Sequence, residues 1–401
     1  MNKLNRRGVL KGGVGAAVLG SLGAGMPALA QDARGVTAQT IKLGQMVAVT
    51  GPLASYGVPI RAGTVAYLGA ANSRGGVNGR KLELVSEDNA FSTPQSLAIT
   101  RKMVADGGVF ALINSMGNVQ VNAVIPYLLE QEKIPILGSY GGIVEWFSPA
   151  RPGLFGLQVL YEDIAGALGR WAAKDGHKKV LAVHIEGASF AKAAKAVEPA
   201  FKTIAAQGSV DFIPVKLPTQ DYAPVALQIM QKKPDAIIAM QTEGEFIALA
   251  RELKNQGSTI PIYVWGPVVT QKALELGAAY IEGIKAFSWT ASPLSNAPGI
   301  AEYRAALQKY APSEKPDFIS LFIYAETKVI VEALSRIKGP FTYEAFSQAL
   351  YSLKNFETGI LPPVTFAPGR HQGVTSLIPL QVKQGVWVDA GPAIDATNLT
   401  W

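Results

Sequence analysis

Three loops rich in glycine and small polar residues could present hydrogen-bond donors to a small molecule. They are residues 50–57 with Tyr56, residues 114–118 with Asn118, and residues 138–142 with Ser139, Tyr140, Gly141 and Gly142. Backbone N–H groups beside glycine are accessible, and those at a helix start favour a carboxylate. Taken singly, each loop is equally explained as an ordinary turn with capping residues. Each follows an expected strand, and three such loops at one sheet edge favour a binding site.

Signals of catalysis are weaker than these signals of binding. Ser189 and Lys192 match the S-x-x-K pattern of a serine-hydrolase family, but the accompanying K-T-G and S-D-N patterns are missing from the sequence. An exported serine hydrolase therefore stays open as an alternative. His177, His184 and His371 have no ligand spacing to one another or to a carboxylate. We expect a binding protein that is not an enzyme and has no metal or cofactor.

The elements around these loops alternate between short apolar strands and helices. In the first half we expect strands at 41–47, 81–87, 109–113 and 135–137, with helices at 59–73, 94–105 and 119–131. A second series has helices at 161–174, 188–207, 223–231, 244–255 and 270–276, and strands at 179–185, 210–217, 235–240, 261–265 and 283–287. Helices at 300–310, 317–338 and 343–353 follow, then strands within 373–388. This order predicts an α/β fold with two similar lobes, each a parallel sheet covered by helices.

Residues 1–30 predict an export signal. Basic residues, including Arg6 and Arg7, precede an uncharged Gly- and Ala-rich stretch that ends in Ala28-Leu29-Ala30, a small-x-small cleavage pattern. The arginine pair favours the twin-arginine route to the periplasm over an ordinary secretory route. The stretch is weakly apolar, so no stable membrane insertion is expected.

Charge and cysteine content exclude several classes of protein. The formal charge of +7 falls to +3 once the four basic residues of segment 1–30 are removed, and basic residues do not cluster later. We therefore expect no nucleic-acid partner. The chain has no cysteine, so it has no lipid-modified Cys anchor, and its fold must be stabilised by core burial.

An ordered set of short motifs resembles one family of exported proteins. The motifs are Ile41–Gly44, Thr50–Gly57, Gly63–Gly79, Glu87–Asn89, Ser92–Gln95 and Lys133–Ile136. They resemble the type I periplasmic solute-binding proteins of ABC importers, the Leu/Ile/Val-binding-protein-like family that takes branched-chain amino acids, amides or aromatic compounds. The similarity extends in weaker form to the end of the chain.

The resemblance implies two Rossmann-like lobes joined by a three-strand hinge that crosses near residues 158, 288 and 354. The N-terminal lobe would be 31–158 plus 289–353 and the C-terminal lobe 159–288 plus 354–401. Closure of such lobes on a ligand is a known hinge motion. By resemblance, the first lobe binds through Tyr56, Asn118 and residues 139–142, and Tyr161 covers the ligand. The second lobe closes with further residues, namely Ser189, Phe190, Thr242 and the turn that contains Pro267 and Val268.

One position departs from the family pattern. Where amino-acid binders carry a glutamate that accepts the ligand ammonium, this chain has Val268. A buried ammonium without a charged acceptor is costly, so either Glu243 or Glu186 substitutes or the ligand lacks an α-amino group. We expect a monomer that delivers an amino acid-like, amide or aromatic carboxylate ligand to an ABC permease. A sensory binding protein stays open, because capture uses the same physics.

Overall fold

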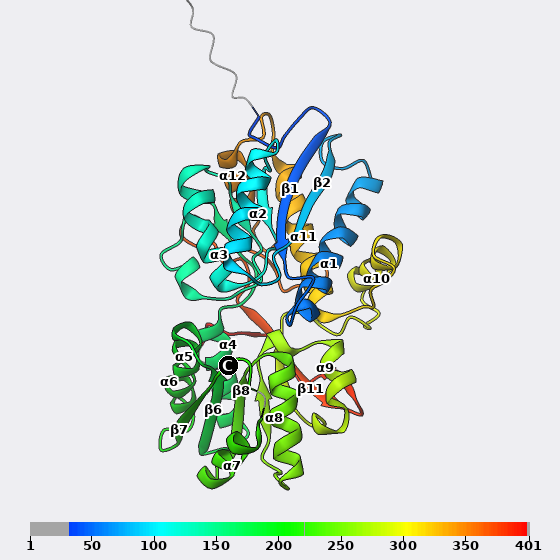
Figure 1. The fold of residues 1–401 in the computed structure, drawn as a ribbon. Coiled ribbons are helices and arrows are strands. Elements are labelled where there is room, and N and C mark those ends of the chain that lie inside the picture. Colours follow the sequence, from blue (N-terminus) through cyan, green and yellow to red (C-terminus); the bar gives the residue numbers. More distant parts are fainter. Residues whose placement is uncertain (1–31, 220, 399–401) are drawn as a thin grey trace, which may run out of the picture.

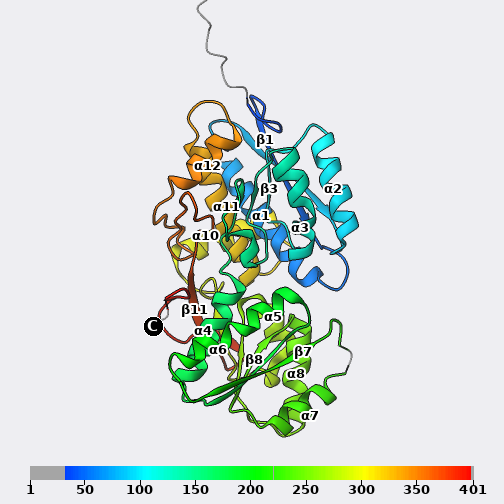
Figure 2. The same ribbon diagram turned by 90° about the vertical axis from the view of Figure 1, so that its left-hand side faces the viewer.

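The computed structural model describes residues 32–219 and 221–398, which form two lobes stacked end to end (Figures 1 and 2). The predicted export signal lies outside the described residues. Each lobe contains a sheet with helices on both faces, so the predicted α/β fold with two lobes is confirmed.

The sheet of the first lobe has five parallel strands in the order β2-β1-β3-β4-β5. Their bounds are Thr40–Val47 for β1, Lys81–Asp88 for β2, Ala111–Ile113 for β3, Ile136–Leu137 for β4 and Leu154–Phe155 for β5. Helices α1 (Ala54–Ser73) and α11 (Phe318–Arg336) cover one face, and α2 (Thr93–Ala105) and α3 (Asn118–Ile125) cover the other (Figures 1 and 2). Strand β1 is almost wholly buried, as expected for a strand covered on both faces.

The sheet of the second lobe has the order β12-β11-β10-β9-β8-β6-β7, and β13 pairs with β11. The parallel strands are β6 (Lys179–Ile185), β7 (Ser209–Val215), β8 (Ala236–Met240), β9 (Ile262–Val264) and β10 (Lys285–Ser288). The C-terminal strands β11 (Ser376–Lys383), β12 (Val386–Asp389) and β13 (Ile394–Asp395) add antiparallel pairs. The helices of this lobe are α4 (Tyr161–Lys174), α5 (Ala188–Lys195), α6 (Val197–Lys202), α7 (Ala223–Lys232), α8 (Glu243–Asn255) and α9 (Gln271–Gly277).

Two helices near prolines differ from the predicted bounds. The helix predicted at 188–207 is two short helices, α5 and α6, that meet at Ala196. Pro199 has no N–H to donate to the carbonyl of Lys195, so a regular helix cannot continue through this point. Helix α1 begins at Ala54, before Pro59, because the carbonyl of Leu53 accepts bonds from the next turn and starts the helix early.

Two of the crossings between the lobes lie side by side. The N–H of Gly156 donates to the carbonyl of His371 at 3.0 Å, and the N–H of Gly373 donates to the carbonyl of Gly156 at 2.8 Å. The ring of Phe366 lies 5.7 Å from that of Phe155 in the first lobe. These contacts place segment 354–371 against the first lobe. Helices α10 (Pro298–Tyr310) and α12 (Tyr343–Tyr351) also lie in the first lobe (Figure 2). We therefore propose that the third crossing lies near residues 372–376 and not near 354.

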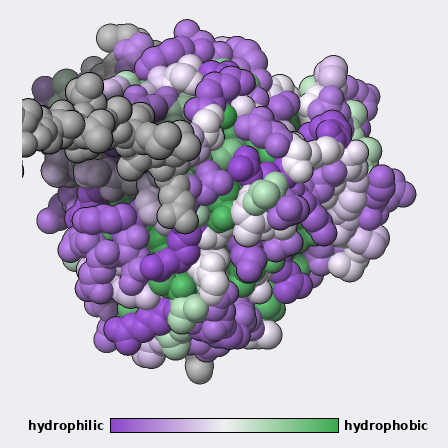
Figure 3. Space-filling view, turned by 90° about the horizontal axis from the view of Figure 1, so that it is seen from above, coloured by the Kyte–Doolittle hydropathy of each residue, from purple (hydrophilic) through white to green (hydrophobic). Residues whose placement is uncertain are grey.

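The outer end of the first lobe is mostly hydrophilic (Figure 3). Outside the residues drawn in grey, apolar side chains on that face form only small patches separated by polar ones. Within the described ranges, no helix combines the length and the apolar character needed to cross a bilayer.

Candidate ligand-binding site

Two adjoining cavities lie between the lobes and receive residues from both. The smaller one, here called the inner chamber, has a volume of about 100 Å³. Its lining comprises Leu53, Tyr56, Phe91, Met116, Gly117, Asn118, Tyr140, Tyr161, Ile185, Phe190, Gln241, Thr242, Trp265 and Pro267. The larger one, the outer chamber, has about 520 Å³ and is lined by Pro52, Leu53, Ser55, Tyr56, Ala90, Phe91, Leu217, Pro218, Thr219, Thr242, Glu243, Gly244, Glu245 and Ala248. Four residues line both chambers, so the two form one cleft.

The predicted site residues divide between this cleft and the protein interior. Lining the inner chamber are Tyr56, Asn118, Tyr140, Tyr161, Phe190, Thr242 and Pro267, and Glu243 lines the outer chamber. The residues that line neither chamber are Ser139, Gly141, Gly142, Ser189 and Val268. Val268 is fully buried in a short 3-10 turn. Val268, which the resemblance predicts at the position of the family glutamate, therefore has no exposed surface in this structure.

Helix starts at the carboxyl ends of strands position the polar residues of the cleft. Tyr56 lies in the first turn of α1 and not in the preceding loop, where the sequence predicted it. Asn118 is the first residue of α3, and Gly117, with a φ of 103°, occupies the N-cap position. Asn118 therefore does not cap the helix, and its Oδ1 is buried without a hydrogen-bond partner among the described residues.

Aromatic rings form the wall that the second lobe contributes. The ring centroid of Tyr161 lies 4.9 Å from that of Trp265 and 6.1 Å from that of Phe190, to which it is nearly parallel. The indole N–H of Trp265 donates to the carbonyl of Gln241 at 2.8 Å, which fixes the orientation of the ring. Such a wall suits an apolar or planar ligand body, because rings bury large apolar areas in few rotamers.

Three tyrosine hydroxyls are among the neutral polar groups that line the inner chamber. Tyr56 accepts a hydrogen bond at 2.9 Å from the backbone N–H of Glu243, which joins the two lobes across the cleft. Burial raises the pKa of Tyr56 and of Tyr140 well above the ordinary value for tyrosine. Burial also raises the pKa of Tyr161 above the ordinary value for tyrosine. All three phenols are therefore protonated at neutral pH and can donate to a ligand.

The carboxylates that line the cleft already have protein partners. Glu243 accepts a hydrogen bond from the hydroxyl of Thr270, and burial raises the pKa of Glu243. Glu245 accepts from the backbone N–H of Thr219 at 3.1 Å and from the Tyr222 hydroxyl. Glu186, the other predicted ammonium acceptor, is exposed and lines neither chamber. Among the described residues, no Asp or Glu lines the inner chamber, and both carboxylates of the outer chamber already accept hydrogen bonds from the protein.

The Ser189–Lys192 pair lacks the geometry of a nucleophile and its base. The ammonium of Lys192 is 2.6 Å from a carboxylate oxygen of Glu145, a residue of the first lobe. That hydrogen bond raises the pKa of Lys192, so this side chain stays protonated at neutral pH and cannot act as a base. No hydrogen bond joins it to Ser189.

Histidines and acidic side chains do not form a metal site in the described part of the chain. His371 is buried and holds together parts of the first lobe: its Nε2 lies 2.7 Å from the Tyr351 hydroxyl and its Nδ1 lies 2.9 Å from the carbonyl of Arg151. His184 has its Nδ1 2.8 Å from the carbonyl of Ile185. These contacts give both histidines a structural role.

Several cleft residues were missed from the sequence. Phe91 follows β2 at the same sheet edge as Tyr56, so an aromatic residue directly after a strand was an available signal. Leu217 and Pro218 follow β7 in the same way in the second lobe. Gln241 follows β8, one residue before the predicted Thr242. Met116 lies within the predicted loop 114–118, and nothing in its type distinguished it from a core residue.

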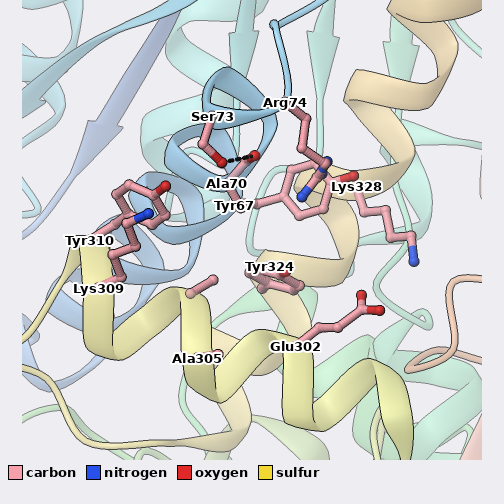
Figure 4. A pocket seen from close by; sticks show the side chains of 11 residues that line it. Tyr67, Ala70, Ser73, Arg74, Glu302, Ala305, Lys309, Tyr310, Tyr324 and Lys328 are labelled. Atoms are coloured by element: carbon pink, nitrogen blue, oxygen red, sulfur yellow. Dashed lines mark hydrogen bonds between the residues drawn. The ribbon is translucent and has the colours of Figure 1, made fainter.

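A separate cavity of about 470 Å³ lies on the first lobe between α1, α10 and α11 (Figure 4). Its buried floor includes Tyr67 and Tyr324, and Arg74, Lys309 and Glu302 lie at its rim. All of its lining comes from one lobe, so lobe closure cannot enclose a ligand there.

Solved structures of similar proteins share this fold. A fatty acid ABC transporter substrate-binding protein from Thermomonospora curvata superposes with a TM-score of 0.83 at 22% identity, over 92% of this chain and 96% of that one. A branched-chain amino acid ABC transporter protein from Thermus thermophilus with bound valine gives a TM-score of 0.79 at 17% identity, over 90% and 98%. At these identities the similarity establishes the fold alone.

Curated relatives match this chain either over a short segment or over most of its length at lower identity. A leucine-, isoleucine-, valine-, threonine- and alanine-binding protein of Pseudomonas aeruginosa is 42% identical over 77 residues, 19% of this chain and 21% of that protein. The chain thus spans about a fifth of the length of that relative. Leu/Ile/Val-binding protein homolog 7 of Brucella abortus is 26% identical over 80% of this chain and 82% of its own length. A profile of the periplasmic binding protein family matches residues 40–386. The chain therefore belongs to the periplasmic binding protein family.

Proposed function

We propose that this protein is the substrate-binding component of an ABC importer and captures a small organic ligand in the cleft by closure of its lobes. The observation that carries the proposal is a cleft whose lining comes from both lobes and combines six aromatic side chains with hydrogen-bonding groups. Similar proteins bear names of branched-chain amino acid and fatty acid binders, which supports small-molecule capture. A partner permease and a monomeric state are part of the same proposal.

The ligand is proposed to lack an α-ammonium group. Val268 is buried, and both lining carboxylates, Glu243 and Glu245, accept hydrogen bonds from the protein. An ammonium in the inner chamber would have no charged acceptor in the described lining, which is costly. An amide or a carboxylate with an apolar body fits the cleft better than a zwitterionic amino acid.

A thermal-shift screen over amino acids, amides and aromatic or aliphatic carboxylates tests this function. A true ligand at 100 times its Kd should stabilise the fold by about 2.7 kcal/mol. Tyr161→Ala, which removes a ring from the inner chamber, should abolish the shift while leaving a cooperative unfolding transition. Stabilisation by zwitterionic amino acids alone would contradict the proposed ligand class, and an unchanged shift in the variant would contradict the site.

Export to the periplasm by the twin-arginine route is also proposed, from the Arg6-Arg7 pair and the family. Replacing both arginines by lysine keeps the charge but removes the paired guanidinium groups. The variant should accumulate as uncleaved precursor, whereas an ordinary secretory signal would tolerate the change.

A further inference from the structure

We propose that the ligand is an elongated amphiphile, with a polar carboxylate or carboxamide head in the inner chamber and an apolar chain in the outer chamber. The chain would pass between Phe91 of the first lobe and Leu217 of the second. This inference rests on the proposed binding function and specifies the class of its ligand.

The sizes of the two chambers support an elongated ligand. The inner chamber, of about 100 Å³, is small beside the several hundred Å³ typical of sites for drug-sized molecules. The outer chamber adds about 520 Å³ and shares Leu53, Tyr56, Phe91 and Thr242 with the inner one. A compact ligand would leave most of this space filled with water, whereas a chain can occupy both chambers.

The outer chamber has apolar walls at its mouth. Phe91 and Leu217 remain 37% and 45% exposed, and they belong to opposite lobes. Prolines and alanines extend the apolar lining, namely Pro52, Ala90, Pro218 and Ala248. Burying a hydrocarbon chain against these side chains removes apolar surface from water on both partners.

The inner chamber has the polar groups that a head requires. Three of its lining residues have buried atoms without hydrogen-bond partners in the described chain: Asn118 Oδ1, the Tyr140 hydroxyl and Gln241 Oε1. The amide N–H group of Gln241 donates to Tyr222 at 2.8 Å, which leaves its Oε1 as an acceptor. Buried polar groups without partners are unfavourable, and a head with both donor and acceptor capacity would satisfy them.

The charge of the lining limits the head further. Lys, Arg and His do not occur among the residues that line either chamber. A carboxylate head would therefore be held by neutral donors such as the Tyr140 hydroxyl, and a carboxamide would need no counter-charge. An ammonium head is disfavoured, because no Asp or Glu is among the described residues that line the inner chamber.

Isothermal titration with straight-chain carboxylates and matching carboxamides of four to ten carbons, below their critical micelle concentrations, tests chain length. Each added methylene should lower Kd by up to about fourfold until the outer chamber is filled. A Kd that does not change with length, or that rises, would overturn the inference. The series with the lower Kd shows whether the head group is a carboxylate or a carboxamide.

Leu217→Ala provides the matched variant, because Leu217 lines only the outer chamber. Its Kd for the ten-carbon ligand should rise about three- to tenfold, and its Kd for the four-carbon ligand should stay unchanged. Leu227→Ala, at a 54% exposed position on α7 outside the cleft, should alter neither. Equal effects of the two variants would also overturn the inference. If ligands bind but their Kd does not depend on chain length, only this inference is refuted. If no compound of the wider thermal-shift screen binds, the proposed function is refuted as well.

Discussion

Glu326 is a buried acid that lies beneath the ligand-binding loops of the first lobe. It is 1% exposed, and a Cβ added to Gly138 would lie 2.6 Å from its carboxyl carbon. Burial raises the pKa of Glu326 to about 8, and neither of its carboxyl oxygens has a hydrogen-bond partner among the described residues. The side chain is therefore largely protonated at neutral pH, next to the first crossing between the lobes.

Replacing Glu326 by glutamine should stabilise the protein at alkaline pH. The unfolded chain ionises near the ordinary value of 4.5, whereas the folded chain does so near 8. Wild-type stability should consequently fall as the pH rises through this window and level off above it. The advantage of Glu326→Gln should grow by up to about 1.4 kcal/mol per pH unit within the window.

Urea unfolding at pH 6.5, 7.25 and 8 measures this difference. The lower limit lies above the pKa of Asp163, which burial raises to about 6. Glu130→Gln, at an exposed position, controls for the loss of one carboxylate. A constant offset between Glu326→Gln and wild type across these pH values would show that Glu326 does not titrate in the window.

At the residue scale, the sequence identified polar and aromatic residues of the cleft better than apolar ones. Tyr56 and Asn118 follow strands in segments that contain glycine, a pattern that indicates ligand contact. Phe91 and Leu217 were missed although each follows a strand, because an apolar residue in a loop is usually one that packs on the core. Only the approach of the two lobes places them across one cavity, and no local pattern contains that information.

At the element scale, strong periodicity predicted most helices and strands, and short elements were missed. Strand β5 has two residues, Leu154 and Phe155, too few to produce a pattern, and its place is set by pairing with β4. Helix α1 starts before Pro59 because the carbonyl of Leu53 accepts hydrogen bonds from the N–H groups of Tyr56 and Gly57. The third crossing was placed from family resemblance, and contacts of segment 354–371 with the first lobe could not be read from the sequence.

Gly57 allows the first turn of α1 to approach the end of β1. A Cβ at this position would lie 2.0 Å from the carbonyl oxygen of Ala48, which is backbone and cannot swing aside. Gly57→Ala should therefore displace α1 and destabilise the fold by about 2 kcal/mol, despite the better helix propensity of alanine. Since Tyr56 is the adjacent residue, ligand affinity should fall as well.

Gly244 in the first turn of α8 provides the matched control for Gly57. No atom lies within 4 Å of a Cβ built there, so Gly244→Ala should gain up to about 1 kcal/mol from helix propensity. Guanidinium unfolding compares the two variants. If Gly57→Ala were also stabilising, the close contact between α1 and Ala48 would not exist in solution.

At the scale of the whole molecule, polar contacts hold the lobes together around the cleft. The Lys192–Glu145 ion pair joins α5 to the first lobe at 2.6 Å, but both side chains are about half exposed. Such pairs contribute about 0–1 kcal/mol and weaken with salt. The bond from the Glu243 N–H to Tyr56 is buried and neutral, so it should be less sensitive to salt.

Asp317 connects the two lobes through the N-termini of two helices. Its Oδ1 accepts from the N–H of Ile319 at 2.8 Å and caps α11 in the first lobe. Its Oδ2 accepts from the N–H of Gln271 at 2.7 Å, the first residue of α9 in the second lobe. Partial positive charge at both helix starts favours a carboxylate between them.

Asp317→Asn separates the cap from the contact between the lobes. The amide oxygen can still cap α11, but the NH₂ group cannot accept from Gln271, so the bond that joins the lobes is lost. A charge-assisted bond contributes about 1.5–3 kcal/mol, and its loss should favour the open form and raise the ligand Kd by about tenfold or more.

Small-angle scattering should show a larger radius of gyration for the ligand-free variant, which saturating ligand reverses. Glu145→Gln, which removes only the exposed pair, should leave the radius close to that of wild type. Identical radii for Asp317→Asn and wild type would mean that this carboxylate does not hold the cleft closed.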